Sequence, residues 1–226
     1  SDYILPTLAG PEIGVASTKA FTTQLTVLAL LSIYIEKQKK QKLDLEEKNV
    51  FDTLFNLHDK ISELLDNCRP FEDIANSLKE AKSIFYIGRG TMYPLALEGA
   101  LKLKEITYKH CEGYAAGELK HGPLALIEED IPVIVLAPSD ENFSKILSNV
   151  QEIKARSGKI IMITDKKGSK KAEEYYDQVL IMPETNLITA PIIYSLPIQL
   201  IAYYLAVLLG TDVDQPRNLA KSVTVE

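Results

Sequence analysis

The sequence has little of what metal sites and disulfide frameworks require. Its 226 residues include two cysteines, Cys68 and Cys111, and three histidines. Neither cysteine belongs to a CxxC pair or stands at a zinc-ligand spacing from a histidine, so we expect no metal and a reducing compartment. The first ten residues contain no basic segment followed by an apolar one. No secretory signal is therefore predicted, and a cytoplasmic location is expected.

Positive charge is also scarce, because 25 basic side chains face 31 acidic ones and the net charge is -6. No basic run is long enough to neutralise a stretch of phosphate backbone, so nucleic acid is not an expected partner. Residues 190–209 carry no charge over a length that could cross a bilayer. Prolines, a glutamine and tyrosines interrupt this run and no basic cluster flanks it, so we expect a buried helix and no membrane contact.

The hydrophobic pattern changes its period along the chain. Helical spacing is found over residues 50–65 and 71–80, and again over 94–109, 142–156 and 190–209. Between these helical segments lie short, almost wholly apolar runs of strand length, at residues 83–87, 133–137, 160–164 and 178–182. Apolar strands that alternate with helices predict an α/β fold with a parallel sheet covered on both faces. Ligands of such sheets usually bind beyond the carboxyl ends of the strands.

The two ends of the chain differ from this alternating pattern. Residues 3–8 predict a short strand, and Ser17 or Thr18 could cap a helix that runs to about Lys40. The polar segment EKQKKQKLDLEEKN follows, so the start reads either as the tail of one unit joined to another or as a solvated helix end and linker within one domain. Residues 212–226 predict an irregular tail.

The first predicted strand of the alternating pattern ends in Gly88-Arg89-Gly90, and Pro94 suits the first turn of the helix that follows. A strand, a glycine turn and a helix N-terminus could bind an anion, with Arg89 supplying charge. A lone GxG is well short of a dinucleotide fingerprint, however, and a plain tight turn explains it as well.

Three charged residues on the next helix, Glu98, Lys102 and Glu105, are spaced by four and three, so they share one face. We expect this face near the carboxyl end of a strand. A carboxylate beside an ammonium group can remove a proton from carbon next to a carbonyl, provided that burial and the lysine tune its pKa. The alternative is an ordinary exposed ion pair between Glu98 and Lys102.

Two further residues could carry chemistry. His121, in a predicted loop between Lys120 and Gly122-Pro123, could move protons near neutral pH, or it could be a surface residue of a turn. Lys221 lies five residues before the C-terminus and could simply be solvated. If the tail folds back over a pocket, desolvation could suit Lys221 to forming a Schiff base with a carbonyl substrate.

Four segments carry a specific resemblance: GPEIGVASTKAFTTQL, GRGTMYPLALEGALKLKEITY, GYAAGELKHGPLALI and DVDQPRNLAKSVTVE. They resemble the carboxyl-terminal isomerase domain of the glutamine:fructose-6-phosphate amidotransferases, also called glucosamine-6-phosphate synthases, and the likeness covers nearly the whole chain. The resemblance implies a sugar isomerase (SIS) fold in three layers, α/β/α. Residues 1–40 would be the last strand and helix of a first SIS subdomain, and residues 41–226 a second subdomain with its tail.

The family's activity gives the candidate residues roles. The resemblance implies conversion of fructose 6-phosphate and glutamine to glucosamine 6-phosphate and glutamate, without a cofactor. Glu105 would move the proton between C1 and C2 with the help of Lys102, and Lys221 would capture the open-chain ketose. His121 would help to open the sugar ring in the active site of the other subunit, so a homodimer is implied.

The resemblance also implies that the backbone around Val15 and Ala220 lines the sugar site. Two parts of the family's enzyme have no counterpart in these 226 residues: a glutaminase domain, and the serine- and threonine-rich loop that holds the sugar phosphate. The corresponding place after the second predicted strand, residues 138–142, reads PSDEN, whose acidic side chains would repel a phosphate. We therefore expect little or no synthase activity from this chain by itself.

Two other functions fit such a fold. One is a phosphosugar-binding sensor module without catalysis, and the other is a smaller SIS enzyme such as a phosphosugar isomerase or a deglycase. Lys221 argues against the sensor, which has no need of such a lysine. The missing phosphate loop argues against the small enzyme, which should carry its own.

Overall fold

The computed structural model describes residues 2–40, 45–129 and 131–222. In this part of the chain, five strands form one sheet in the order β2-β1-β3-β4-β5, and every neighbouring pair is parallel. The strands are β1 (Ser83–Gly88), β2 (His110–Ala115), β3 (Pro132–Leu136), β4 (Lys159–Asp165) and β5 (Gln178–Met182). The predicted parallel α/β sheet is confirmed.

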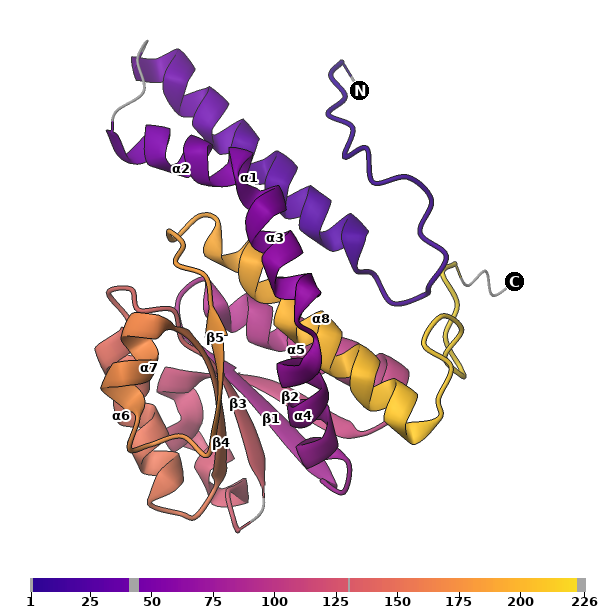
Figure 1. The fold of residues 1–226 in the computed structure, drawn as a ribbon, viewed down its shortest axis with the longest axis vertical. Coiled ribbons are helices and arrows are strands. Elements are labelled where there is room, and N and C mark those ends of the chain that lie inside the picture. Colours follow the sequence, from indigo (N-terminus) through magenta and orange to yellow (C-terminus); the bar gives the residue numbers. More distant parts are fainter. Residues whose placement is uncertain (1, 41–44, 130, 223–226) are drawn as a thin grey trace.

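Helices cover both faces of the sheet, as Figure 1 shows. One face carries α4 (Arg69–Leu78), α5 (Met92–Thr107) and α8 (Ala190–Leu209), and the other carries α6 (Phe143–Lys154) and α7 (Lys166–Ala172). Successive strand side chains point to opposite faces, so Ile134 and Leu136 join the α5 and α8 side of the core while Val133 and Val135 join the α6 side. Burial on both faces explains why the strands read as continuous apolar runs.

One strand escaped the sequence analysis. The edge strand β2, with the sequence HCEGYA, is half-buried and has no apolar alternation. Its register comes from pairing with β1, where Ser83 lies opposite His110 and Gly88 opposite Ala115. The short helix α7 was missed as well. After β2, the predicted loop is a pair of 3₁₀ helices, η1 (Ala116–His121) and η2 (Pro123–Leu126).

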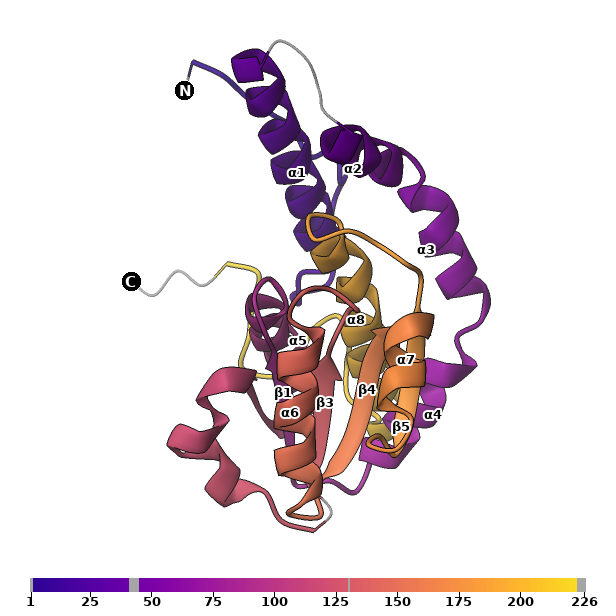
Figure 2. The same ribbon diagram turned by 90° about the vertical axis from the view of Figure 1, so that its left-hand side faces the viewer.

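The N-terminal region extends away from the sheet (Figures 1 and 2). The predicted first helix is confirmed as α1 (Lys19–Lys40), whereas the single helix predicted over residues 50–65 is two, α2 (Leu45–Phe55) and α3 (Leu57–Asp66). The strand predicted at residues 3–8 was wrong. Tyr3 and Leu8 are 91% and 89% exposed, and no strand of the described chain pairs with this segment, so its backbone has no ladder to join. The division at residue 40 stays a prediction.

The apolar run at residues 190–209 is the core helix α8, as predicted. Within the described residues it alone is long and apolar enough to cross a membrane, but most of it is buried inside the protein. It packs against α4 and α5 and carries the largest share of the core on that face. It also forms one wall of the cavity described next.

Candidate active site

The three charged residues of α5 form one cluster. The Lys102 Nζ lies 2.6 Å from the Glu105 Oε2 and 3.6 Å from the Glu98 Oε1. Lys102 is only 4% exposed, so the alternative of an ordinary surface pair was wrong. Burial raises the pKa of the Glu98 carboxyl in spite of the neighbouring Lys102 ammonium. The cluster therefore combines an ion pair with a carboxyl group that holds its proton more readily than an ordinary glutamate.

The cluster does not lie where the sequence placed it. The helix α5 begins at the carboxyl end of β1, but Lys102 is ten residues further along, about 15 Å towards the opposite edge of the sheet. There it borders a cavity of about 360 Å³, a size typical of small-molecule sites. The walls come from α5, from α8 and from two segments far apart in sequence, and include Lys102, Ile106, Gln199, Tyr203, Glu12, Gly14, Lys19 and Asp214.

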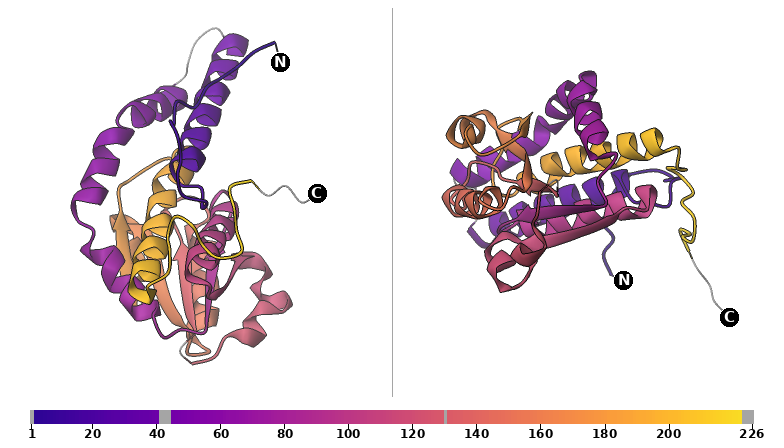
Figure 3. Two further views of the ribbon diagram at one scale, coloured as in Figure 1. Left: turned by 90° about the vertical axis from the view of Figure 1, so that its right-hand side faces the viewer. Right: turned by 90° about the horizontal axis from the view of Figure 1, so that it is seen from below.

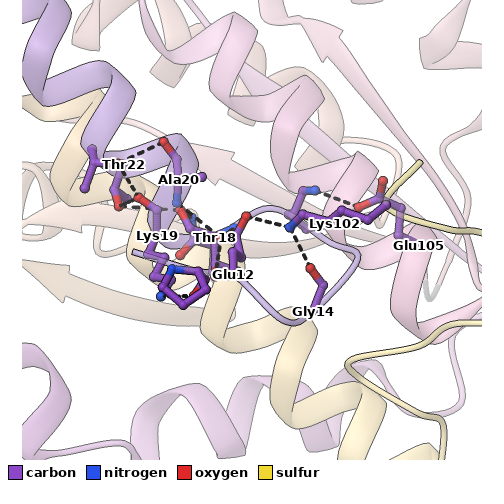
Figure 4. Close-up of polar contacts among 12 residues, drawn as sticks. Glu12, Gly14, Thr18, Lys19, Ala20, Thr22, Lys102 and Glu105 are labelled. Atoms are coloured by element: carbon purple, nitrogen blue, oxygen red, sulfur yellow. Dashed lines mark hydrogen bonds and ion pairs between the residues drawn. The ribbon is translucent and has the colours of Figure 1, made fainter. Parts of the chain in front are cut away.

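A residue that the sequence analysis missed, Glu12, joins these distant segments (Figure 4). Its Oε1 accepts hydrogen bonds from the backbone N–H groups of Thr18 (2.9 Å) and Ala20 (3.2 Å) at the start of α1. Its Oε2 accepts one from the Lys221 Nζ (2.8 Å). Burial alone would raise the pKa of the Glu12 carboxyl, but Lys221 and these N–H groups together lower it to about 2. A cap from six residues upstream of the helix follows no local capping motif, so the sequence alone could not indicate it.

The C-terminal tail is irregular, as predicted, and it folds back over the loop that precedes α1 (Figure 3). The Val15 N–H donates to the Asp214 carbonyl oxygen (2.8 Å), and the Lys221 Nζ also donates to the Gly14 carbonyl oxygen (2.7 Å). Further along, the Arg217 guanidinium lies 4.3 Å from the centre of the Tyr108 ring. The tail thus folds back over a loop that lines the cavity, but the Lys221 side chain is 47% exposed, so the desolvation expected for a functional Lys221 is not seen here. Ala220 is exposed beside it.

His121 lies apart from the other candidates. It ends η1, which packs with α6 on the opposite face of the sheet from α5 and α8. Its side chain is 75% exposed, and its Nε2 is 4.0 Å from the Glu118 Oε2. The structure of one chain therefore brings together Lys102, Glu105 and the contacts of Lys221, but not His121.

The glycine turn after β1 is a tight turn and not an anion site. The N–H groups of Met92 and Tyr93 are already bonded to the carbonyl oxygens of Arg89 and Gly90, and the adjoining cavity holds only about 10 Å³. A Cβ on Gly88 would lie 2.1 Å from the Met92 carbonyl oxygen, so the close approach of strand and helix requires glycine there.

No metal site was expected. In the part of the chain that the structure describes, no group of three or more His, Cys, Asp or Glu side chains could hold a metal ion.

The fold and the site can now be set beside known proteins. Residues 77–209 match the SIS domain family, so the chain belongs to that family. Over all 226 residues it is 56% identical to the glutamine--fructose-6-phosphate aminotransferase [isomerizing] of Bartonella henselae and 54% identical to that of Zymomonas mobilis. The chain spans 37% of the length of each of these relatives.

Solved structures agree with this assignment. The C-terminal domain of glucosamine-fructose-6-phosphate aminotransferase from Francisella tularensis superimposes with a TM-score of 0.87 and 42% identity, over 92% of this chain and 58% of that one. The tagatose-6-phosphate ketose/aldose isomerase from Escherichia coli shares the fold alone, with a TM-score of 0.69 and 19% identity over 92% of this chain and 55% of the other. The predicted SIS fold is confirmed.

Proposed function

We propose that this chain is the isomerase part of a cytoplasmic enzyme that converts fructose 6-phosphate and glutamine-derived ammonia to glucosamine 6-phosphate. The relatives that share more than half of its residues are named for this chemistry, and they align with the whole of the chain. The proposal covers the activity, the sugar-phosphate substrates and the residues that act on them.

The observation that carries the proposal is the meeting of two distant segments at one cavity. The acid-base cluster of α5 reaches it through Lys102, while Glu12 and Gly14, which hold Lys221, line another wall. An amine and a carboxylate-ammonium pair around one cavity suit a carbonyl substrate whose neighbouring carbon must lose a proton.

In the proposed reaction, the Lys221 amine adds to the C2 carbonyl of the open-chain ketose, and water leaves to give an imine. Ammonia then replaces the lysine at C2. Glu105 removes a proton from C1 and returns one to C2, while the proton of the C1 hydroxyl moves to the C2 nitrogen. C1 becomes the aldehyde, and the imine becomes the amine of the amino sugar. The Lys102 ammonium donates a hydrogen bond to the Glu105 Oε2 (2.6 Å) and so holds this carboxylate in place.

The Lys221 ammonium is bonded to the ionised Glu12, so it must lose a proton and leave that contact before it can attack a carbonyl carbon. The backbone of Val15, whose N–H donates to the Asp214 carbonyl oxygen, and of Ala220, the neighbour of Lys221 in the chain, would line the bound sugar.

His121 enters the proposal through a homodimer. Its exposure, on the sheet face opposite α5, suits a residue that acts in the cavity of a second copy. A mixture of Glu105→Gln and His121→Asn chains tests this in the full-length enzyme. Each variant is inactive alone, and the mixture should regain up to about a quarter of the activity, since random pairing makes half of the molecules mixed dimers with one intact site of two. No recovery would contradict the shared site.

A calorimetric titration with fructose 6-phosphate tests the proposal as a whole, using Glu105→Gln and Lys221→Ala. Binding that either substitution changes supports it. Tight binding that neither substitution affects would favour the sensor module. Conversion of the sugar phosphate without glutamine or ammonia would favour a small isomerase.

A further inference from the structure

A second group of cavities lies at the carboxyl edge of the sheet and includes Pro138, Ser139 and Asp140, the segment whose acidic side chains were expected to repel a phosphate. One cavity, of about 180 Å³, is formed by the loops after β3, β4 and β5 and by the first residue of α8. A shallower one, of about 430 Å³, adjoins it, because Lys167 and Glu184 line both. Together they reach the ~300–1,000 Å³ typical of small-molecule sites. We call this pair the strand-end cleft.

The strand-end cleft is distinct from the cavity at Lys102, since the two share no lining residue. Ala190 contributes to the cleft, while Gln199 contributes to the other cavity, nine residues or about 14 Å along α8. A ligand in the cleft could therefore bind while the proposed catalytic cavity is occupied or empty.

Four lysines line the shallower cavity together with Glu184, in a chain whose net charge is -6. Three of them, Lys166, Lys167 and Lys170, are exposed and have no side-chain hydrogen bond or ion pair within the described residues. The fourth, Lys171, lies over the Phe143 ring, 5.9 Å from its centre. Clustered cations without partners repel one another, and a phosphate group would relieve this repulsion.

The cleft also carries three carboxylates, those of Asp140, Asp165 and Glu184. Asp165 is fully engaged, because its two oxygens accept hydrogen bonds from Ser139, Lys167 and Gly168. Asp140 and Glu184 are different. Asp140 is half-buried and accepts hydrogen bonds from backbone N–H groups alone, that of Asn142 at 2.8 Å among them, and the Glu184 side chain has no hydrogen bond or ion pair within the described chain. These two carboxylates can receive an ammonium group, while Thr185 and Asn186 offer polar contacts to hydroxyl groups.

A buried hydroxyl group lies behind the same wall. Tyr194 is 0% exposed, and within the described part of the chain its hydroxyl has no hydrogen-bond partner. It follows Ala190 by one helical turn, and Asp165 and Asp140 are near enough for their charges to act on it. A buried hydroxyl without a partner is costly in an apolar core, and it is retained here beside the polar cleft.

We infer that the strand-end cleft binds a small polyhydroxylated molecule that carries both an ammonium group and a phosphate group, in the class of amino-sugar phosphates. The phosphate lies against Lys167 and Lys170, and the ammonium lies against Asp140 and Glu184. The product of the proposed reaction belongs to this class, so the choice of glucosamine 6-phosphate as probe rests on the proposed function. A site outside the catalytic cavity would let the chain respond to the amount of its product.

The test is an amide NMR titration of the 226-residue chain with four probes: glucosamine 6-phosphate, glucose 6-phosphate, glucosamine and inorganic phosphate. Glucosamine 6-phosphate should shift the amides of Ser139, Thr185 and Asn186, and each probe that lacks one of the two charges should bind there about tenfold more weakly. Lys167→Gln with Lys170→Gln should weaken binding by about tenfold or more, whereas the matched change Lys82→Gln, at the opposite edge of the sheet, should leave it unchanged.

Asp140→Asn tests the ammonium contact separately from the phosphate contact. It should weaken the binding of glucosamine 6-phosphate but not that of glucose 6-phosphate. No shift at the cleft, or equal shifts with inorganic phosphate, would overturn the inference. Shifts at Glu12 and Gly14 report on the proposed function instead. If the cleft amides shift as expected but those of Glu12 and Gly14 do not, the result counts against the proposed catalytic cavity. The inference about the ligand of the strand-end cleft is then unaffected.

Discussion

Replacing Glu12 by glutamine should weaken the attachment of the C-terminal tail while sparing most of the cap on α1. A glutamine oxygen can still accept the hydrogen bonds from the N–H groups of Thr18 and Ala20, which Glu12 now accepts through one oxygen. The other end of a glutamine side chain is a donor, however, so it cannot accept from the Lys221 ammonium. The variant thus removes one charged contact between the two ends of the chain.

The magnitude follows from the pKa of Glu12, which falls from 4.5 to about 2. Linkage converts this shift to at most about 3 kcal/mol, and because the Lys221 side chain is 47% exposed, screening reduces the contribution to about 1–2 kcal/mol. Since the folded pKa is the lower one, this stability is present above about pH 4.5 and is lost as the pH falls towards 2. Glu12→Gln should therefore cost about 1–2 kcal/mol at pH 7 and almost nothing at pH 2.

Urea denaturation at a series of pH values measures the difference. Glu128→Gln is the matched control, because Glu128 is exposed and its side chain has no recorded partner in the described chain. If Glu12→Gln and Glu128→Gln give the same stability at every pH, the Glu12 carboxylate does not hold Lys221, and the proposed contact between the two ends of the chain is wrong.

Three further substitutions test the rest of the structure. Lys102→Met leaves the half-buried Glu98 and Glu105 without their shared cation and should cost about 3 kcal/mol in urea denaturation; a loss near zero would contradict the ion cluster. Burial raises the folded pKa of Glu98 above its ordinary 4.5, so ionisation costs stability as the pH rises past that value. Glu98→Gln should then be more stable than the parent at pH 7 but not at pH 4, and parallel pH profiles would refute this. Gly88→Ala places a Cβ 2.1 Å from the Met92 carbonyl oxygen and should lower the melting temperature by several degrees; an unchanged value would mean that the turn has room.

Much of the fold was predictable because burial on two faces leaves a strong pattern. The central residues of β1, β3, β4 and β5 are almost all apolar, and each strand was predicted within a residue or two of its bounds. The edge strand β2 has no such pattern, because its sequence, HCEGYA, contains a glycine and charged residues and its side chains are mostly half-buried. Residues 3–8 have an apolar pattern, but the strand predicted there does not form. A strand needs a neighbouring strand to pair with, and this exposed segment has none in the described chain.

The site was predictable only in part. Helical spacing was enough to place Lys102 between Glu98 and Glu105. The contact between Glu12 and Lys221 joins residues 209 positions apart and depends on how the tail folds, which no local pattern records. Sequence also misplaced the cluster along α5, because spacing reports which face a residue occupies and not how far it lies from the strand ends.

The most direct test of the central claim is chemical trapping of the imine. The chain is incubated with saturating fructose 6-phosphate, reduced with borohydride and digested, and the modified lysine is identified by mass spectrometry. The account predicts a reduced sugar adduct concentrated on Lys221, absent from Lys221→Arg and unaffected by Lys82→Gln. Labelling spread evenly over the surface lysines, or an adduct that persists in Lys221→Arg, would contradict the assignment of Lys221 as the residue that captures the ketose.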